Sequence, residues 1–369
     1  MTADIDSAAL RERFVDELRD EGRLRSPRWI EAFGSVPREW FVPRFTVAAG
    51  DELVERDLDH PEALEAVYSD APLVTQWDAG GTATSSSSAP GLMAAMLEHL
   101  DARPGHRVLE IGTGTGYNLG LLCHALGSEA VTSVDLDEPL AVRAADRLRE
   151  LGFTPRIVVA DGRVGAAERG PFDRIIATCG FHRVPSAWAN QIADGGVVVV
   201  PLGGGLAVLR AGPDGLCGRM VGPAAFMSRN SADEVGLRGR DVFQAVQPLP
   251  AADRVVRGLD RDTFFDPGFA VLRTLLIPTL HLVLQEDGDG TTYFLRDPVR
   301  DVSTRAEVRG GTTSVSARGG DLWEEVLDVE ERWRAHGCPD IDRFGLTVRP
   351  GGSHELWLDE PGVVVTALP

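Results

Sequence analysis

The chain has 369 residues, and its fractions of hydrophobic residues (43%) and charged residues (25%) are those of a globular protein long enough for two domains. Its net charge of −19, with no Lys at all, disfavours binding to nucleic acid, because neutralising phosphates needs a basic face. Four Cys without a C-x-x-C pair argue against a metal site or a disulfide framework, and the lack of a long apolar run and of a signal peptide predicts a cytoplasmic protein that does not contact membrane.

The first part of the chain is predicted to be helical. Apolar residues at helical spacing predict helices over residues 8–24 and 28–33, and residues 72–76 form a short extended segment. We therefore expect an N-terminal helical segment over residues 1–75.

From residue 106 onward, strand signals alternate with helix signals, which predicts a doubly wound α/β core over residues 76–230. Apolar runs such as residues 197–200 suit strands covered on both faces, as in a parallel sheet. A hairpin over residues 206–221 can complete the sheet. The predicted strands are 107–111, 130–134, 156–159, 172–178 and 196–201, and the predicted helices are 91–100, 117–126 and 139–151.

After about residue 230 the apolar runs shorten, which predicts a separate C-terminal α+β domain over residues 231–369. We expect strands between residues 269 and 284, joined at Ile277-Pro278, and an amphipathic helix over 322–335. Further predicted elements are a tight turn at 285–290, a strand at 291–295 and a closing hairpin formed by 343–348 and 354–358.

A glycine-rich segment, E-I-G-T-G-T-G-Y over residues 110–117, follows the first core strand and opens a helix. Its glycines let the backbone approach a ligand at a helix N-terminus. Dinucleotide-binding segments have G-x-G-x-x-G, whereas here the third glycine comes one residue early. Together with the acidic residue before it, this spacing indicates S-adenosylmethionine, whose product is S-adenosylhomocysteine. The predicted cofactor contacts in this segment are Glu110, Gly112, Thr113, Gly114, Gly116 and Tyr117.

Two acidic residues at strand ends are further candidates for cofactor binding. Asp135, followed by Leu136, ends the second core strand, where a carboxylate can accept from both ribose hydroxyls. Asp137 is the competing candidate. Asp161, followed by Gly162, comes after the third strand and can accept from the adenine amino group. The alternative for each is an exposed strand-end or turn carboxylate without a ligand.

An ordered set of short motifs resembles the protein-L-isoaspartate O-methyltransferase family over roughly residues 8–225. The resemblance implies a class I S-adenosylmethionine methyltransferase with a Rossmann-like doubly wound sheet. Members of that family esterify the α-carboxylate of isoaspartyl residues, and the ester collapses to a succinimide. The motifs are Val36-Pro37-Arg38-Glu39, Phe41-Val42-Pro43, Ser88-Ala89-Pro90, residues 108–117, Asp161-Gly162, residues 171–176, Val184-Pro185 and residues 194–203.

Two departures from that family are similar to methyltransferases encoded beside ATP-grasp ligases in ribosomal-peptide (graspetide) pathways. About 140 residues follow the catalytic domain, and the run Thr84–Ser88 replaces a small Thr/Ser segment. This resemblance implies a modified, macrocyclised precursor peptide as substrate and an ATP-grasp ligase as a pathway partner. The reaction implied is esterification of an Asp side chain, after which the ester collapses to aspartimide. The C-terminal domain is then expected to recognise the peptide.

Methyl transfer to a carboxylate requires positioning rather than a strong base, because the carboxylate is already ionised at neutral pH. The hydroxyls of Ser85–Ser88, ahead of a predicted helix, can donate hydrogen bonds to one carboxylate oxygen. The resemblance favours Ser88 as the catalytic residue, followed by Ser87 and Ser86, with Ser85 as a substrate contact. A polar loop or a helix N-cap is the alternative interpretation.

The segment after the fourth strand supplies further candidates for substrate contacts, namely Cys179, His182 and Arg183. Packing is the competing interpretation for His182, because the chemistry requires no base. An acidic peptide also needs cationic side chains along its groove, and the candidates are Arg38, Arg44, Arg183 and Arg229.

Three other functions remain open at this stage. One is a repair-type isoaspartyl methyltransferase with an accessory domain, which turnover of isoaspartyl peptides would identify. Another is a peptide-binding scaffold without activity, which the intact glycines and Asp135 disfavour. The last is a nicotinamide-dependent dehydrogenase, which the glycine spacing disfavours.

Overall fold

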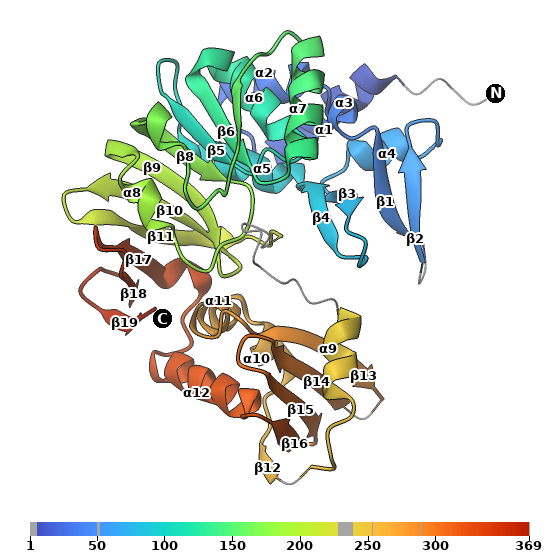
Figure 1. Ribbon diagram of the computed structural model, residues 1–369, viewed down its shortest axis with the longest axis vertical. Helices are drawn as coiled ribbons and strands as arrows, with labels where there is room; N and C mark the ends of the chain where they lie inside the picture. The colour runs from blue at the N-terminus through green and yellow to red at the C-terminus, as the bar shows by residue number, and fades with distance from the viewer. Residues whose placement is uncertain (1–5, 50–51, 228–238, 253, 289, 369) are drawn as a thin grey trace.

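The computed structural model describes residues 6–49, 52–227, 239–252, 254–288 and 290–368, and over these residues it contains three β-sheets (Figure 1). Two sheets are small and antiparallel. The third is a ten-stranded sheet that joins the middle of the chain to its C-terminal strands.

The N-terminal region begins with helices α1 (Ser7–Asp20) and α2 (Pro27–Ser35), which confirms the two predicted helices. The short helix α3 (Arg38–Phe41) follows. The next elements form a four-stranded antiparallel sheet in the order β2-β1-β3-β4, which the sequence did not predict. The strands are β1 (Arg44–Ala49), β2 (Glu52–Asp57), β3 (Leu73–Trp77) and β4 (Ala83–Ser87), and the short helix α4 (Ala63–Val67) lies between β2 and β3 in the chain.

The predicted parallel core is confirmed, with strands β7, β6, β5, β8 and β9 side by side and mutually parallel. The chain passes from β5 outward to β6 and β7 and then returns to the other side of β5 as β8. The order of the strands therefore reverses between β5 and β8, which is where such sheets bind ligands. The bounds are α5 (Pro90–Leu100), β5 (Val108–Ile111), α6 (Tyr117–Leu126), β6 (Val131–Asp135), α7 (Glu138–Glu150), β7 (Arg156–Val159), β8 (Phe172–Ala177), α8 (Ser186–Ala189) and β9 (Ile192–Leu202).

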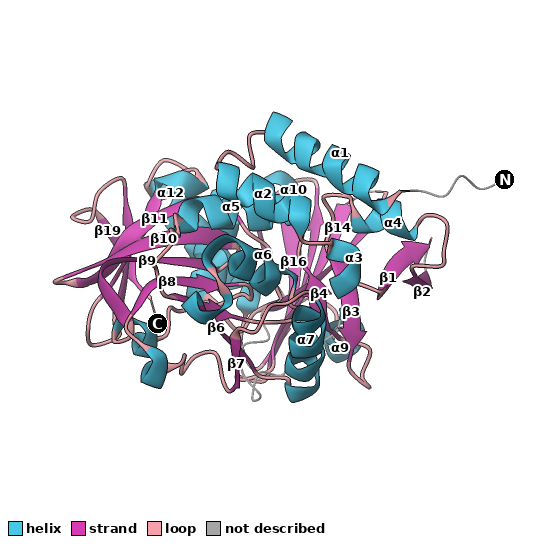
Figure 2. Ribbon diagram, turned by 90° about the horizontal axis from the view of Figure 1, so that it is seen from above, coloured by secondary structure: helices cyan, strands magenta, loops and turns pink. Residues whose placement is uncertain are grey.

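Both faces of this sheet are covered, because alternate residues of its buried strands enter two different cores. Ile176, Val197 and Val199 pack with the helices α1, α2, α5 and α6, of which α2 and α5 lie side by side in Figure 2. Ile175 and Val198 pack on the opposite face with α8 and with two helices from later in the chain, α11 (Pro267–Leu276) and α12 (Leu322–Ala335). The apolar run at 197–200 thus has the two-sided burial that its composition indicated.

The sheet continues beyond the parallel strands through the predicted hairpin, β10 (Gly205–Gly212) and β11 (Gly215–Pro223). The closing hairpin is also confirmed, as β17 (Phe344–Val348) and β18 (His354–Leu358), and β19 (Val364–Ala367) follows it. β17 pairs with β11, so these C-terminal strands extend the same sheet rather than a separate one. The boundary predicted near residue 230 lies outside the described residues, and the domain assignment stays a prediction.

The remaining C-terminal elements form a five-stranded antiparallel sheet in the order β12-β16-β15-β14-β13. The predicted helix at 322–335 is confirmed as α12, which is buried through Trp323 and Val326. The elements are α9 (Gly239–Val246), β12 (Arg254–Arg257), α10 (Arg261–Phe265), α11 (Pro267–Leu276), β13 (His281–Asp287), β14 (Gly290–Asp297), β15 (Val302–Arg309), β16 (Thr312–Arg318) and α12 (Leu322–Ala335).

One prediction in this region was wrong. Residues 269–276 form part of the helix α11 and not a strand. The carboxylate of Asp266 accepts from the backbone N–H groups of Gly268 and Phe269, and Pro267 occupies the first helical position, where it needs no donor. These start signals outweigh the short apolar run that indicated a strand.

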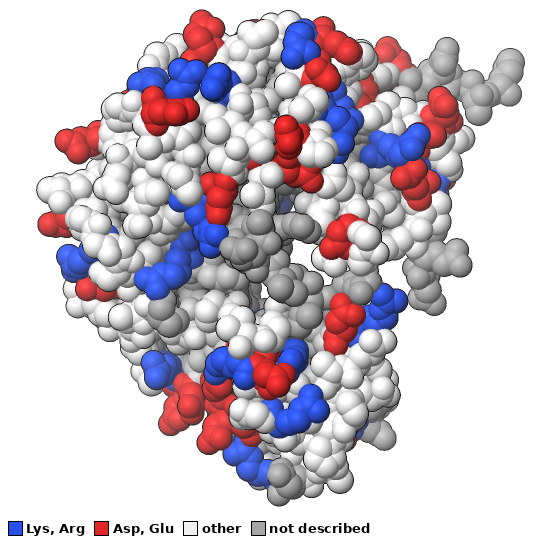
Figure 3. Space-filling model, in the orientation of Figure 1, with Lys and Arg blue, Asp and Glu red and all other residues white. Residues whose placement is uncertain are grey.

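Within the described residues, no helix combines the length and apolar character that a membrane span requires. On the face shown in Figure 3, Arg side chains alternate with Asp and Glu rather than forming one continuous basic area. Three 3-10 turns complete the described structure, at Ser128–Ala130, Ala167–Arg169 and Ile341–Arg343.

Candidate active site

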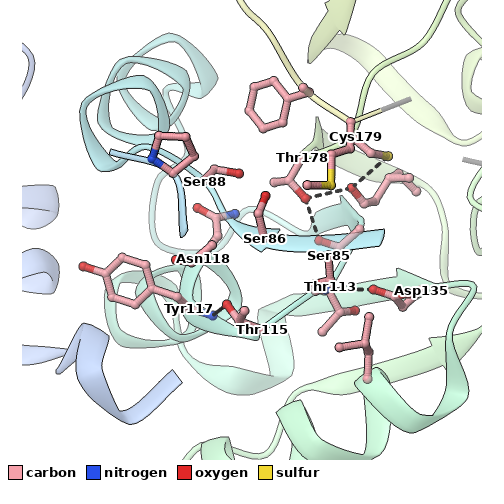
Figure 4. Close-up of a pocket in the computed structure, with 18 of the residues that line it drawn as sticks. Ser85, Ser86, Ser88, Thr113, Thr115, Tyr117, Asn118, Asp135, Thr178 and Cys179 are labelled. Atoms are coloured by element: carbon pink, nitrogen blue, oxygen red, sulfur yellow. Dashed lines mark hydrogen bonds between the residues drawn. The ribbon is translucent and has the colours of Figure 1, made fainter. Parts of the chain in front are cut away.

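A cavity of about 560 Å³ lies where β5 and β8 end, at the reversal of strand order. This volume is within the range of about 300–1,000 Å³ that is usual for small-molecule sites. Two segments supply much of the cavity lining (Figure 4). We call residues 111–118, from the end of β5 into α6, the glycine wall, and residues 83–90, from β4 to the start of α5, the serine wall.

The glycine wall brings backbone rather than side chains to the cavity. Gly112 has a φ of +97° and Gly114 a φ of +53°, which side chains rarely tolerate. A Cβ on Gly112 would lie 2.7 Å from Thr178 Oγ1, so this position has no room for a side chain. Gly116 is not among the cavity-lining residues, and a Cβ there would lie 3.0 Å from the Cβ of Ala144. Gly112 and Gly114 thus line the cavity, whereas Gly116 lies at a contact with α7.

Glu110 lies beneath the glycine wall and does not line the cavity. It is fully buried, and its two oxygens accept from Asn118 Nδ2 (2.7 Å) and Ser133 Oγ (2.5 Å). Because Ser133 donates to Glu110, the 2.6 Å contact between Thr113 and Ser133 is a hydrogen bond donated by Thr113. Burial raises the pKa of Glu110 to about 7, and the two hydrogen bonds offset this only in part. Glu110 therefore supports the wall from below, while Thr113 and Tyr117 line the cavity.

The three residues at the end of β6, Asp135, Leu136 and Asp137, all line the cavity. Asp135 Oδ2 accepts from the N–H of Gly114 (2.7 Å) and its Oδ1 from the N–H of Asp137 (2.9 Å). Burial raises the pKa of Asp135. Asp137 caps α7 through Leu140 N–H (2.9 Å) and accepts from Gln76 Nε2 (2.8 Å). Both carboxylates accept two hydrogen bonds within the protein, so Asp135 as the ribose contact, with Asp137 as its competitor, stays a prediction.

Asp161, the predicted adenine contact, does not line the cavity. Gly162 lines the cavity, and a Cβ there would lie 2.5 Å from Ile111 Cγ2. Asp161 is not among the lining residues and pairs with Arg163 at 2.7 Å. The hydrogen bond from Arg163 lowers the pKa of Asp161. A role of Asp161 in adenine binding stays a prediction.

The serine wall is a strand rather than the loop that the sequence allowed. β4 pairs with β3 in antiparallel register, with Ser87 opposite Leu73 and Ser86 opposite Val74. Only Ser88 adjoins the start of α5, so the helix-dipole argument applies to Ser88 and not to Ser85–Ser87. The burial of Ser85 and Ser87 alternates with the partial exposure of Ser86, as expected along a pleated strand.

The hydroxyls of the serine wall are engaged to different degrees. Ser85 Oγ accepts from Thr75 Oγ1 (3.4 Å), and Ser87 Oγ accepts from Arg38 Nε (3.2 Å). Ser86 and Ser88 are half-buried and line the cavity, and Figure 4 shows Ser88 well away from Asp135. Ser88 and Asp135 therefore lie at two separate parts of one cavity.

The predicted substrate contacts after β8 are only partly brought to the cavity. Cys179 lines it, whereas His182 and Arg183 do not. His182 is half-buried, and burial lowers its pKa. Arg183 Nη2 donates to the carbonyl oxygen of Gly352 (3.1 Å), in the turn between β17 and β18. Contact of His182 and Arg183 with a substrate would therefore have to occur outside this cavity.

The candidate groove arginines are not grouped together. The prediction that Arg38 lines a peptide groove was wrong, because its guanidinium is fully buried. Arg44 is exposed and pairs with Glu55 at 3.5 Å. Arg229 lies outside the described residues.

Several lining residues were missed by the sequence reasoning. Thr178 directly follows β8, and its Oγ1 donates to the carbonyl oxygen of Gly112 (2.5 Å). The rule that placed Asp135 at a strand end applies equally to Thr178 and would have found it. Asn118, the second residue of α6, and residues 225–227, which follow β11, carry no comparable local signal. In the described part of the chain, no group of three His, Cys, Asp or Glu side chains is arranged to hold a metal ion.

Comparisons with known proteins point to one family. A family model described as protein-L-isoaspartate(D-aspartate) O-methyltransferase matches residues 46–211. A protein-L-isoaspartate O-methyltransferase of Pyrobaculum arsenaticum is 36% identical over 193 residues, which are 52% of this chain and 83% of that protein. A protein of the same name from Methylorubrum populi is 34% identical over 224 residues, or 59% of this chain and 94% of its own.

A solved structure of a protein-L-isoaspartate O-methyltransferase is similar in fold, with a TM-score of 0.56 and 24% sequence identity. The alignment covers 95% of this chain and 100% of that chain. The shared fold therefore includes elements beyond the glycine wall and the parallel strands.

Proposed function

Because the chain belongs to the protein-L-isoaspartate O-methyltransferase family and is an S-adenosylmethionine-dependent carboxyl methyltransferase, we propose that it esterifies the side chain of one Asp in a ribosomally made, macrocyclised peptide. The neighbouring backbone amide then displaces methanol, which gives aspartimide. The observation that carries this proposal is that one cavity is lined both by the carboxylate of Asp135, which suits a nucleoside, and by the hydroxyl of Ser88, which lies well away from it.

The residues present fit the cofactor. Gly112 and Gly114 form a cradle that a Cβ would fill, and the Asp135 carboxylate faces the same space. Asp135 would accept from the ribose hydroxyls, and the glycine wall would hold the methionine portion against its backbone. When bound, S-adenosylmethionine supplies a methyl group on a sulfonium, which an ionised carboxylate can take without a general base.

The serine wall would hold the acceptor. The hydroxyls of Ser86 and Ser88 can each donate to a carboxylate oxygen while the other oxygen stays free to react. Thr178 and residues 225–227 narrow the cavity on another side and limit the access of water to the reacting groups. In this proposal the chain contributes orientation and exclusion of water, and it transfers no proton before the methyl transfer.

Repair of isoaspartyl residues is a second candidate with the same chemistry. It is favoured by the relatives that carry that name at 34–36% identity. The additional C-terminal region does not separate the two candidates, because a solved protein of that name shares the fold over 95% of this chain. The macrocyclic peptide, an ATP-grasp ligase as pathway partner, a peptide-recognising C-terminal domain and a cytoplasmic location therefore remain proposals from sequence resemblance.

A panel of peptides separates the two candidates. Three peptides of one sequence would be compared: the linear Asp form, the linear isoaspartyl form and the side-chain macrocycle with the Asp intact. We expect methyl ester and then aspartimide from the macrocycle alone. Turnover of the linear isoaspartyl peptide at a similar or higher kcat/KM would instead establish the repair activity. A chain that binds no S-adenosylhomocysteine in calorimetry would be a scaffold without activity.

A further inference from the structure

Arg38, from the Val-Pro-Arg-Glu motif, is fully buried next to the serine wall. Its Nε donates to Ser87 Oγ (3.2 Å), and its Nη2 donates to the carbonyl oxygens of Ser87 (3.3 Å) and Ser88 (3.1 Å). The same guanidinium reaches the turn after α4, where it donates to the carbonyl oxygens of Val67, Ser69 and Ala71. One planar group thus joins the end of β4 to a segment about twenty residues earlier in the chain.

Phe41, at the C-terminal end of α3, contacts the glycine wall. The ring of Phe41 lies 5.8 Å from that of Tyr117, centroid to centroid. A Cβ on Gly116 would lie 3.3 Å from Phe41 Cδ1, so the helix approaches the start of α6 closely. The short helix α3 therefore contacts both walls, through Phe41 on one side and Arg38 on the other.

The hydrogen bonds of Arg38 in the described structure are all made to neutral oxygens. Burial lowers the pKa of Arg38 to about 10, which still leaves it charged at neutral pH. Asp70 is the carboxylate that acts on it electrostatically, and Asp70 Oδ1 accepts from the N–H of Gly91 (2.6 Å) in the first turn of α5. The segment from Ser87 to Gly91 is thus fixed from both ends.

We propose that Arg38 is a positioning residue for methyl transfer: it fixes the carbonyl groups of Ser87 and Ser88 and thereby sets the distance between the serine wall and the cofactor held by the glycine wall. The inference rests on the proposed function, in which the serine wall holds the acceptor carboxylate. A displacement of about 1 Å at such a site can lower the rate on the order of 100-fold, whereas cofactor affinity depends on the other wall.

The test compares R38K and R38A with a matched control, R174A. Arg174 is also a buried arginine, and its Nε donates to the carbonyl oxygen of Leu100 (2.7 Å), away from the cavity. Three quantities are measured for the full-length chain: kcat with the peptide that wild type turns over, affinity for S-adenosylhomocysteine, and amide hydrogen exchange of residues 83–92 and 108–118. R38A is also measured with guanidinium chloride at a non-denaturing concentration.

We expect R38K and R38A to lower kcat by on the order of 10–100-fold and to speed exchange of residues 83–92, with affinity for S-adenosylhomocysteine within about twofold of wild type. Guanidinium should restore part of kcat and of the protection in R38A, and it should not change R174A. A folded R38A with wild-type kcat and exchange would overturn the inference, and so would equal rescue of R174A.

The exchange measurement keeps this inference separate from the proposed function. If wild type methylates none of the three peptides, the proposed function fails. Protection of residues 83–92 that is lost in R38A and regained with guanidinium would then still support the positioning of the serine wall, and unchanged protection would refute it.

Discussion

The two walls of the cavity are built in different ways. The glycine wall is one continuous segment of eight residues, and the shortest of its supporting contacts, from Glu110 to Asn118, spans only eight positions. The serine wall is assembled over long distances, because Arg38 contacts Ser87 from 49 positions earlier and β3 supplies its pairing strand. The glycine wall depends mainly on the positive-φ backbone of its own glycines and on hydrogen bonds with Asp135 and Thr178, whereas the serine wall depends on contacts with the N-terminal region.

This difference predicts that changes to the two walls affect different steps. Damage to the glycine wall or its support should change stability and cofactor affinity. Damage to the serine wall should change turnover while the cofactor still binds. Three substitutions test this separation, in order of decreasing expected effect.

The largest expected effect is on the pH dependence of stability, through Glu110. Its pKa in the folded state is about 7, whereas an unperturbed Glu has a pKa of about 4.3. The folded state therefore holds this proton more tightly, so the free energy of unfolding falls as pH rises through the range between these two values. Between pH 5 and 8, wild type should lose about 2–3 kcal/mol more than Glu110→Gln, as measured by urea denaturation. The same pH dependence in both proteins would contradict the buried ionisable support.

The next effect concerns cofactor affinity, through Asp135. Asp135→Ala should weaken S-adenosylhomocysteine binding by about 1–3 kcal/mol in calorimetry, because hydrogen-bond donors of the ligand are left without their acceptor. Asp161→Ala is the matched control, since its carboxylate pairs with Arg163 outside the cavity lining. An equal loss in both variants would restore the predicted adenine contact of Asp161.

The smallest expected effect is on turnover, through Ser88. Ser88→Ala should lower kcat about tenfold, the equivalent of one hydrogen bond to a charged group, with unchanged affinity for S-adenosylhomocysteine. Steady-state rates with the accepted peptide measure this change. A normal rate in Ser88→Ala together with a slow Ser86→Ala would transfer the role to Ser86.

The same contrast explains how much could be predicted from the sequence. The parallel core and the glycine wall were predictable, because strand runs, helix starts and glycine spacing are local patterns. Asp135 was placed correctly at the cavity, because carboxyl ends of parallel strands meet at one edge. Gly116 and Glu110 do not line the cavity. Gly116 packs closely against α7, and Glu110 accepts a hydrogen bond from Asn118; neither contact can be read from the local sequence.

The serine wall and its surroundings were harder to predict. A run of Ser and Thr carries no apolar alternation, so the pairing of β4 with β3 could not be seen. Arg38 looked like a groove residue because its six acceptors come from two segments that only the folded chain brings together. The return of β17 to β11 is likewise a long-range pairing without a local signal.

The measurement that tests the central claim most directly is tandem mass spectrometry of a peptide after incubation with the chain and S-adenosylmethionine. We predict that the peptide gains one methyl group on an Asp carboxylate, that the ester is labile to mild base, and that it then loses methanol to give the cyclic imide. A methyl group that survives base treatment, or one found on a nitrogen or sulfur atom, would contradict the assignment of this cavity to carboxyl methylation.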